Sequence, residues 1–110
     1  MSEWKIAYSQ QAERDLDAIC RYIAGTLLVP DTAKKQVRRI ADAIDELNHM
    51  PLRHRLCEYE PWHSRGLRQL QADNYLVFYL PVELKKVVFI IRVMYGGRDI
   101  SEALRETTIE

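Results

Sequence analysis

Arginines in the second half of the chain interrupt runs of residues that otherwise have strand character. Arg68 follows Gly66-Leu67, Arg92 lies within the longest β-branched run, and Arg98 follows two glycines. Because burying an arginine without a partner is costly, an arginine on a strand indicates an open sheet face or a site. Such cations would bind a phosphate or an acidic partner.

Side chains near these arginines could transfer protons. Tyr95, His63 and Glu60 are the candidates for a general acid or base. Cleavage of RNA requires a base near the 2′-hydroxyl, a donor to the leaving oxygen and positive charge on the phosphate. The candidate catalytic residues of an RNA-cleaving site are Arg68, Arg92 and Tyr95. The candidate target-binding residues are Arg98, His63 and Glu60.

A structural interpretation competes with this chemistry. Arg68 and Arg92 would then pair with carboxylates on the sheet, and Arg98 would pair with Asp99 or the last helix. Tyr95 would be an ordinary core tyrosine. The residues alone leave both interpretations open.

The histidines and cysteines give no sign of a metal or cofactor site. His49, His54 and His63 lie singly in loop-like sequence, where a histidine is usually solvated, and no two of them have metal-ligand spacing. Cys20 and Cys57 form no CxxC motif or Cys/His cluster, so we expect reduced thiols. We expect no metal and no cofactor, because no glycine-rich phosphate loop is visible either.

Hydrophobic spacing predicts the elements that position these residues. Alternation of Trp4, Ile6 and Tyr8 indicates a short strand, and Ser9 is placed to cap a following helix. Two amphipathic helices follow, and Pro51 stops the second. Their apolar stripes are Ala12, Leu16, Ile19, Cys20, Ile23 and Leu27, then Ala33, Val37, Ile40, Ala41, Ile44 and Leu47.

The remaining sequence predicts a loop at 51–65, three strands and a last helix. The strands are Leu67–Gln71, Tyr75–Leu80 (ended by Pro81) and Val87–Tyr95, the last being central. A capping box beginning at Asp99 starts the short C-terminal helix. The predicted fold class is α+β: an N-terminal strand and a helical hairpin packed on a small, mostly antiparallel sheet, in one domain covering 1–110.

Alternate residues of the run 87–95 should share a face. The odd-numbered set is the more uniformly apolar, so we expect Val87, Phe89, Ile91, Val93 and Tyr95 to face the helices. Arg92 would then lie on the open face, where Arg68 joins it if the register allows. Tyr95 reaches that site only if the strand bends, which Gly96-Gly97 permit.

Charge is unevenly distributed along a chain whose formal net charge is zero. Residues 51–98 carry eight basic and four acidic side chains, and residues 99–110 carry one basic and four acidic. This pattern predicts a positive surface, although ordinary surface chemistry explains it as well. The chain lacks the run of about 18 apolar residues that a membrane span needs. It also shows no signal peptide, so we expect a cytoplasmic protein that does not bind membranes.

In its ordered set of motifs, the chain resembles the RelE/ParE family of bacterial toxins over nearly its whole length. The matching segments are Tyr8-Ser9, Ala12, Asp15-Leu16 and Ile19, then Ala33, Ile40, Ala43-Ile44, Leu47 and Met50-Pro51, and finally Gly66-Leu67-Arg68, Asn74–Tyr79 and Arg92–Asp99. The resemblance implies a toxin of a type II toxin–antitoxin system. It also implies a cognate antitoxin, encoded beside the toxin, that wraps it with an extended, helical segment.

Within that family the resemblance implies two alternative targets. RelE-like members cleave mRNA on the ribosome, whereas ParE-like members poison DNA gyrase and are not known to need catalytic residues. An arginine often found in RelE-like members is replaced here by Asn74 or Tyr75, and their strong basicity is missing. The ending Arg92–Asp99 resembles the ParE type, although Tyr95 resembles a tyrosine of some RNA-cleaving members. A ParE-like action is slightly favoured, and a non-toxic antitoxin-binding member is a further alternative.

Overall fold

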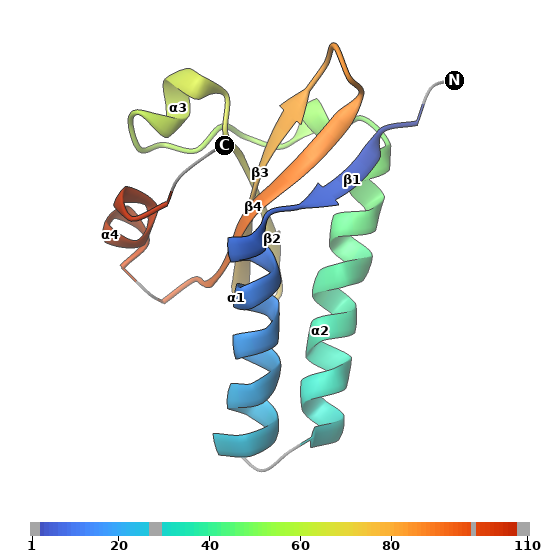
Figure 1. Ribbon diagram of the computed structural model, residues 1–110, viewed down its shortest axis with the longest axis vertical. Helices are drawn as coiled ribbons and strands as arrows, with labels where there is room; N and C mark the ends of the chain where they lie inside the picture. The colour runs from blue at the N-terminus through green and yellow to red at the C-terminus, as the bar shows by residue number, and fades with distance from the viewer. Residues whose placement is uncertain (1–2, 27–29, 98, 108–110) are drawn as a thin grey trace.

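The computed structural model describes residues 3–26, 30–97 and 99–107, which form helices on both sides of one sheet (Figure 1). The strands are β1 (Lys5–Tyr8), β2 (Arg68–Ala72), β3 (Tyr75–Val82) and β4 (Val87–Tyr95). The α-helices are α1 (Gln10–Arg21), α2 (Pro30–Asp45), α3 (Trp62–Arg65) and α4 (Ile100–Arg105). A π-helical segment, η1 (Tyr22–Thr26), extends α1, and two 3₁₀ turns, η2 (Glu46–Asn48) and η3 (Pro51–Arg53), follow α2.

The four strands form a mixed sheet in the order β1-β4-β3-β2. β1 runs parallel to β4, whereas β4, β3 and β2 are successively antiparallel. The expected fold class is therefore confirmed, including the central position of β4. A strand rich in β-branched residues suits this position because both of its edges are paired.

The helical hairpin of α1 and α2 packs on one face of the sheet (Figure 1). Ser9 caps α1 as expected, since its hydroxyl accepts a hydrogen bond from the Ala12 amide at 2.9 Å. Apolar residues of both helices and the sheet form the core between these layers. Its buried members are Ala12, Ile40, Ile44, Leu47, Ala72, Val77, Tyr79, Val88, Ile90 and Val93.

The opposite face is less open than the sequence suggested, because a second core covers part of it. The helices α3 and α4 supply residues that pack there against β3 and β4. The buried members are Cys57, Trp62, Leu67, Phe78, Ile91, Met94, Ile100, Ala103 and Leu104. The helix α3 lies within 51–65, which we expected to be loop throughout, and its four residues are too few to produce a helical period.

A β-bulge in β4 overturns the expected assignment of its faces for Ile91 and Phe89, whereas Val93 faces the helices as expected. Phe78 pairs with Arg92 and Tyr79 pairs with Ile90, so Ile91 has no partner on β3. The bulge reverses the alternation: Ile90 and Val93 both face the helices, while Ile91 packs in the second core. Phe89, which we expected to face the helices, is 37% exposed.

The end of β3 differs from the sequence prediction, whereas the start of α4 agrees with it. Pro81 does not end β3, which continues to Val82. β2 pairs with β3 only as far as Tyr79, so the missing N–H of Pro81 leaves no ladder partner unsatisfied on that side. Asp99 caps α4 as expected, accepting a hydrogen bond from the Glu102 amide at 3.2 Å. In the described ranges no helix is long and apolar enough to span a membrane.

Candidate functional site

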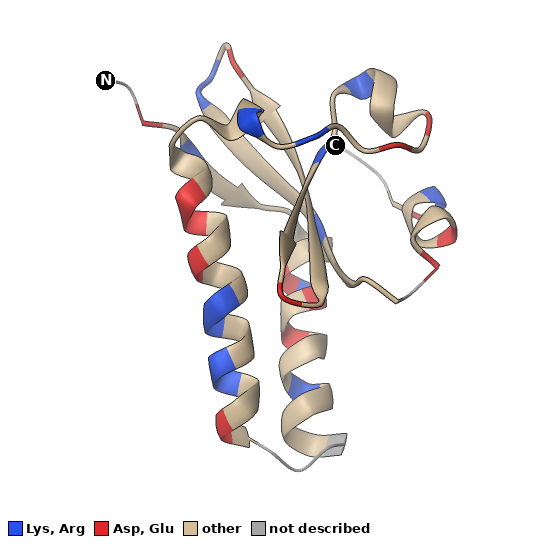
Figure 2. Ribbon diagram, turned by 180° about the vertical axis from the view of Figure 1, so that it is seen from behind, with Lys and Arg blue, Asp and Glu red and all other residues tan. Residues whose placement is uncertain are grey.

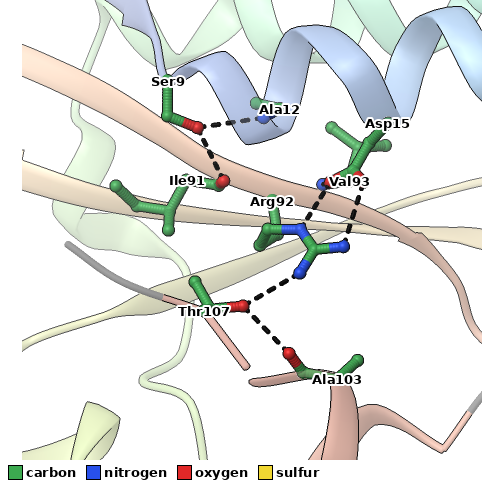
Figure 3. Close-up of polar contacts among 8 residues, drawn as sticks. All are labelled: Ser9, Ala12, Asp15, Ile91, Arg92, Val93, Ala103 and Thr107. Carbon is green, nitrogen blue, oxygen red and sulfur yellow. Dashed lines mark hydrogen bonds and ion pairs between the residues drawn. The ribbon is translucent and has the colours of Figure 1, made fainter. Parts of the chain in front are cut away.

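Arg92 is held by a bidentate ion pair with Asp15 of α1 (Figure 3). Its Nε donates to Asp15 Oδ2 at 2.7 Å and its Nη2 donates to Oδ1 at 3.0 Å. The two side chains are only 10% and 14% exposed. Two parallel hydrogen bonds between ionised partners make a strong contact, so Arg92 is already engaged in the folded chain.

The same pair joins three elements of the fold. Asp15 Oδ2 also accepts a hydrogen bond from the Val93 amide at 2.9 Å, beyond the point where β1 stops pairing with β4. Arg92 Nη1 donates to the Thr107 hydroxyl at 3.0 Å, just after α4 (Figure 3). Arg92 therefore matches the structural interpretation of the sequence, although its carboxylate partner comes from α1 rather than from the sheet.

Arg68 lies at the start of β2, on the other face of the sheet from Arg92. It pairs with Tyr79, whose side chain belongs to the helix-side core, whereas Arg92 pairs with Phe78 of the second core. Arg68 Nη1 donates to the His54 carbonyl at 2.6 Å. The register therefore does not bring Arg68 and Arg92 onto one face.

Tyr95 lies at the end of β4 and is 55% exposed, so it is not a core tyrosine. Its ring meets Tyr75 edge-on, with centroids 5.8 Å apart, and a side chain at Gly97 would collide with the ring. On β3, Tyr95 pairs with Tyr75 and Arg68 pairs with Tyr79. These two partners are four positions apart, so Tyr95 and Arg68 are separated by about 13 Å along the strand. The three candidate catalytic residues therefore occupy three separate places.

Two of the three candidate target-binding residues, His63 and Glu60, have local structural roles around α3. His63 Nδ1 donates to the Cys57 carbonyl at 2.8 Å. Glu60 accepts hydrogen bonds from the Ser64 amide at 3.0 Å and the Ser64 hydroxyl at 2.9 Å. The Ser64 amide, followed by its hydroxyl, lowers the pKa of the Glu60 carboxyl. Arg98 lies outside the described residues.

Sequence reasoning missed a cluster of basic side chains next to Arg68. His54, which we set aside as a solvated loop histidine, is half-buried, and its ring meets Tyr79 edge-on at 6.3 Å between centroids. Arg53 Nε donates to His54 Nε2 at 3.4 Å. No spacing rule links His54 to Arg68, because the contact depends on how the chain after α2 returns along β2.

A groove of about 630 Å³ opens beside the start of α1, at the margin of the second core. Its floor is apolar and consists of Leu80, Val82, Phe89 and Ile91. Arg14 and Lys85 also line it, and no carboxylate of the described residues does. An exposed apolar surface with a basic rim is typical of a protein-binding site.

No group of three or more histidine, cysteine, aspartate or glutamate side chains that could hold a metal ion occurs in residues 3–26, 30–97 and 99–107.

Solved structures share this fold. This chain superimposes on a chain of a chromosomal ParDE toxin–antitoxin system from P. aeruginosa with a TM-score of 0.71 and 22% identity, covering 84% of this chain and 96% of that one. A chain of the RelBE2 toxin–antitoxin complex from Mycobacterium tuberculosis gives a TM-score of 0.60 and 18% identity, covering 89% and 97%. A mutant of the E. coli toxin RelE in the free state gives 0.61 and 17%, covering 94% and 93%. At these identities the likeness shows the fold alone.

The fold and the sequence together define the class of protein. The architecture is that of the RelE/ParE superfamily, the toxins of type II toxin–antitoxin systems. The model of the ParE toxin of the type II toxin–antitoxin system parDE matches residues 6–100, and the chain belongs to that family. A search of curated proteins gave no match.

Proposed function

We propose that this chain is a toxin that inhibits bacterial growth by binding DNA gyrase, without catalysing a reaction. The observation that carries the proposal is the separation of Arg68, Arg92 and Tyr95, which lie on different faces or at different ends of the sheet. An RNA-cleaving site needs its base, acid and phosphate-binding cation around one phosphate. The match to the ParE family model supports the same proposal.

The engagement of Arg92 adds a second argument. Its guanidinium already contacts Asp15 and Thr107, so using it on a phosphate would require breaking a nearly buried ion pair. Breaking such a pair costs about 3 kcal/mol or more. Arg92 is thus better suited to holding α1 and α4 on β4 than to stabilising a transition state.

The partner that we propose for the groove beside α1 is the cognate antitoxin. An amphipathic segment of that protein would place apolar side chains against Phe89 and Leu80, and acidic side chains toward Arg14 and Lys85. Charge complementarity of this kind directs a partner to one site and one orientation. The structures of the ParDE system and of the RelBE2 complex, which share the fold, contain such toxin–antitoxin pairs.

Induced expression in a bacterial host without antitoxin tests the proposed function. Pulse labelling should show that DNA synthesis falls before protein synthesis, with filamentous cells. An early collapse of protein synthesis would instead support ribosome-dependent cleavage of mRNA. Unimpaired growth at full expression would mean that the chain is a non-toxic, antitoxin-binding member.

A further inference from the structure

The segment that follows η3 lies along the edge of the sheet beside β2. The Gln69 amide donates to the Arg55 carbonyl at 3.0 Å, and the Cys57 amide donates to the Leu67 carbonyl at 2.7 Å. Between these two hydrogen bonds, Leu56 and Arg68 form an antiparallel β-bridge. Figure 2 shows basic segments in this part of the chain, near the upper end of the sheet. These backbone contacts hold the segment that carries Arg53 and His54 next to Arg68.

Three cationic or protonatable groups meet at this edge: Arg53, His54 and Arg68. Arg53 Nε donates to His54 Nε2 at 3.4 Å, and Arg53 Nη1 donates to the His49 carbonyl at 3.2 Å. Arg68 Nη1 donates to the His54 backbone carbonyl at 2.6 Å. Tyr79 lies behind them, and its hydroxyl donates to the Pro51 carbonyl at 2.6 Å. These bonds hold the loop against β3, with the Arg53 guanidinium at the imidazole ring of His54 and the Arg68 guanidinium at the backbone carbonyl of the same residue.

No carboxylate of the described residues forms an ion pair with Arg53 or Arg68. Asp45 and Glu46 line a hollow together with Arg53, beyond ion-pair distance. The pKa of His54 is lowered by burial first, and then by Arg53 and Arg68. The imidazole therefore lies in a positive environment.

We propose that Arg53, His54 and Arg68 form a binding site for a phosphate group. Guanidinium groups present forked donors that match phosphate oxygens. Arg68 uses Nη1 on a carbonyl, which leaves its Nε and Nη2 to donate. Arg53 uses Nε on His54 and Nη1 on the His49 carbonyl, which leaves its Nη2. Two guanidinium groups held in this way suit a phosphate better than they suit a single carboxylate, and the site does not depend on the proposed target.

The phosphate can come from free inorganic phosphate or from a nucleic-acid backbone. Free phosphate should cause saturable shifts of the His54 ring signals in NMR spectra of the whole protein. The Arg53→Ala variant tests the site without disturbing the core, because Arg53 is exposed, and Arg65→Ala is its control. Arg65 is also an exposed arginine, but it stacks on Trp62 at 5.4 Å, outside the cluster.

Arg53→Ala should weaken phosphate binding about ten-fold, the usual effect of losing a hydrogen bond from a charged group, and Arg65→Ala should leave it unchanged. A response to phosphate that is absent, or equal in both arginine variants, would overturn the proposal.

Fluorescence anisotropy of short single-stranded RNA and of duplex DNA distinguishes a nucleic-acid backbone from inorganic phosphate as the source of the phosphate group. Tighter binding of either polymer than of inorganic phosphate, lost in Arg53→Ala and kept in Arg65→Ala, would identify a backbone phosphate as the ligand. Binding of inorganic phosphate alone, with the same dependence on Arg53, would identify a small anion as the ligand. Both outcomes support the site. Polymer binding that is equally strong in both variants would contradict it.

Discussion

Asp15 and Arg92 are 77 positions apart in the chain and form a bidentate ion pair with a shortest distance of 2.7 Å. The pair joins α1 to the central strand at the point where β1 no longer pairs with it. Its position explains why an arginine occurs on a buried strand: the guanidinium is neutralised by a residue of the helical hairpin. The contact makes Arg92 part of the fold.

Replacing Asp15 with alanine should therefore destabilise the protein strongly. Removal of one partner leaves the other charge nearly buried and unpaired, which costs about 3 kcal/mol. The double variant Asp15→Leu/Arg92→Leu should recover part of this loss, because no charge is then stranded. Urea unfolding of both proteins and of the wild type would measure the difference. Equal stability of Asp15→Ala and wild type would show that the pair has no structural role.

Tyr79 should make the protein lose stability in alkali. Burial raises its pKa to about 12, although Arg68 and Arg53 oppose that rise. An unfolded tyrosine titrates near pH 10, so the unfolded state loses its proton first, and stability falls between about pH 10 and 12 by roughly 1.4 kcal/mol per unit. Below about pH 10 this contribution is complete.

The Tyr79→Phe variant isolates that effect. It should be about 1 kcal/mol less stable at neutral pH, because the Pro51 carbonyl loses its donor. Its stability should then fall less steeply than that of the wild type above about pH 10. Denaturant unfolding at a series of pH values gives both slopes, and parallel slopes would refute the assignment to Tyr79.

Glu60 should stabilise the start of α3 only while it is ionised. The Ser64 amide and hydroxyl lower its pKa, so its contribution is present above the unfolded pKa and is lost as pH falls through the folded one. Glu60→Gln should speed hydrogen exchange of the Ser64 amide. Glu58→Gln is the matched control, because Glu58 is an exposed glutamate of the same loop and is not the residue that bonds Ser64. Similar exchange in the two variants would contradict the role of Glu60.

Phe89 should be important for antitoxin binding and not for the fold. Phe89→Asp puts a negative charge on the apolar floor of the groove, where it would repel acidic side chains of the partner. We expect at least a roughly ten-fold loss of affinity for the antitoxin, measured by calorimetry. Leu84→Asp is the control, because Leu84 is 100% exposed and lies outside the groove. An equal effect of both variants would place the antitoxin elsewhere.

The sequence predicted the fold well because its elements have strong local signals. The period-two alternation at Trp4, Ile6 and Tyr8 and the caps at Ser9 and Asp99 all correspond to observed features. The faces of β4 were not predictable in this way. The bulge at Ile91 depends on pairing with β3, and one extra residue reverses the alternation on which the argument rested.

The candidate site was less predictable than the fold for the same reason. The sequence identified Arg68 and Arg92 as unusual, but whether they share a face depends on the register of the strands. The observed register places them on opposite faces. The Asp15 partner of Arg92 is on α1, and no local pattern connects the two residues. His54 gave no signal either, because its neighbours are brought together only by the bridge beside β2.

Tyr95 distinguishes the two modes of action most simply in cells. If the toxin acts by binding, Tyr95→Phe should remain fully toxic, because the ring stays in place beside Tyr75 and only the hydroxyl is lost. Loss of growth inhibition in this variant, with an unchanged circular dichroism spectrum and unfolding midpoint, would argue for proton transfer by Tyr95 and against a binding toxin.

The most direct test of the central claim is a supercoiling assay with purified gyrase and an excess of the purified protein. We predict that supercoiling is inhibited, and that mRNA on purified ribosomes stays intact under the same conditions. Undiminished supercoiling, together with cleavage of ribosome-bound mRNA by the wild type but not by Tyr95→Phe, would contradict the account.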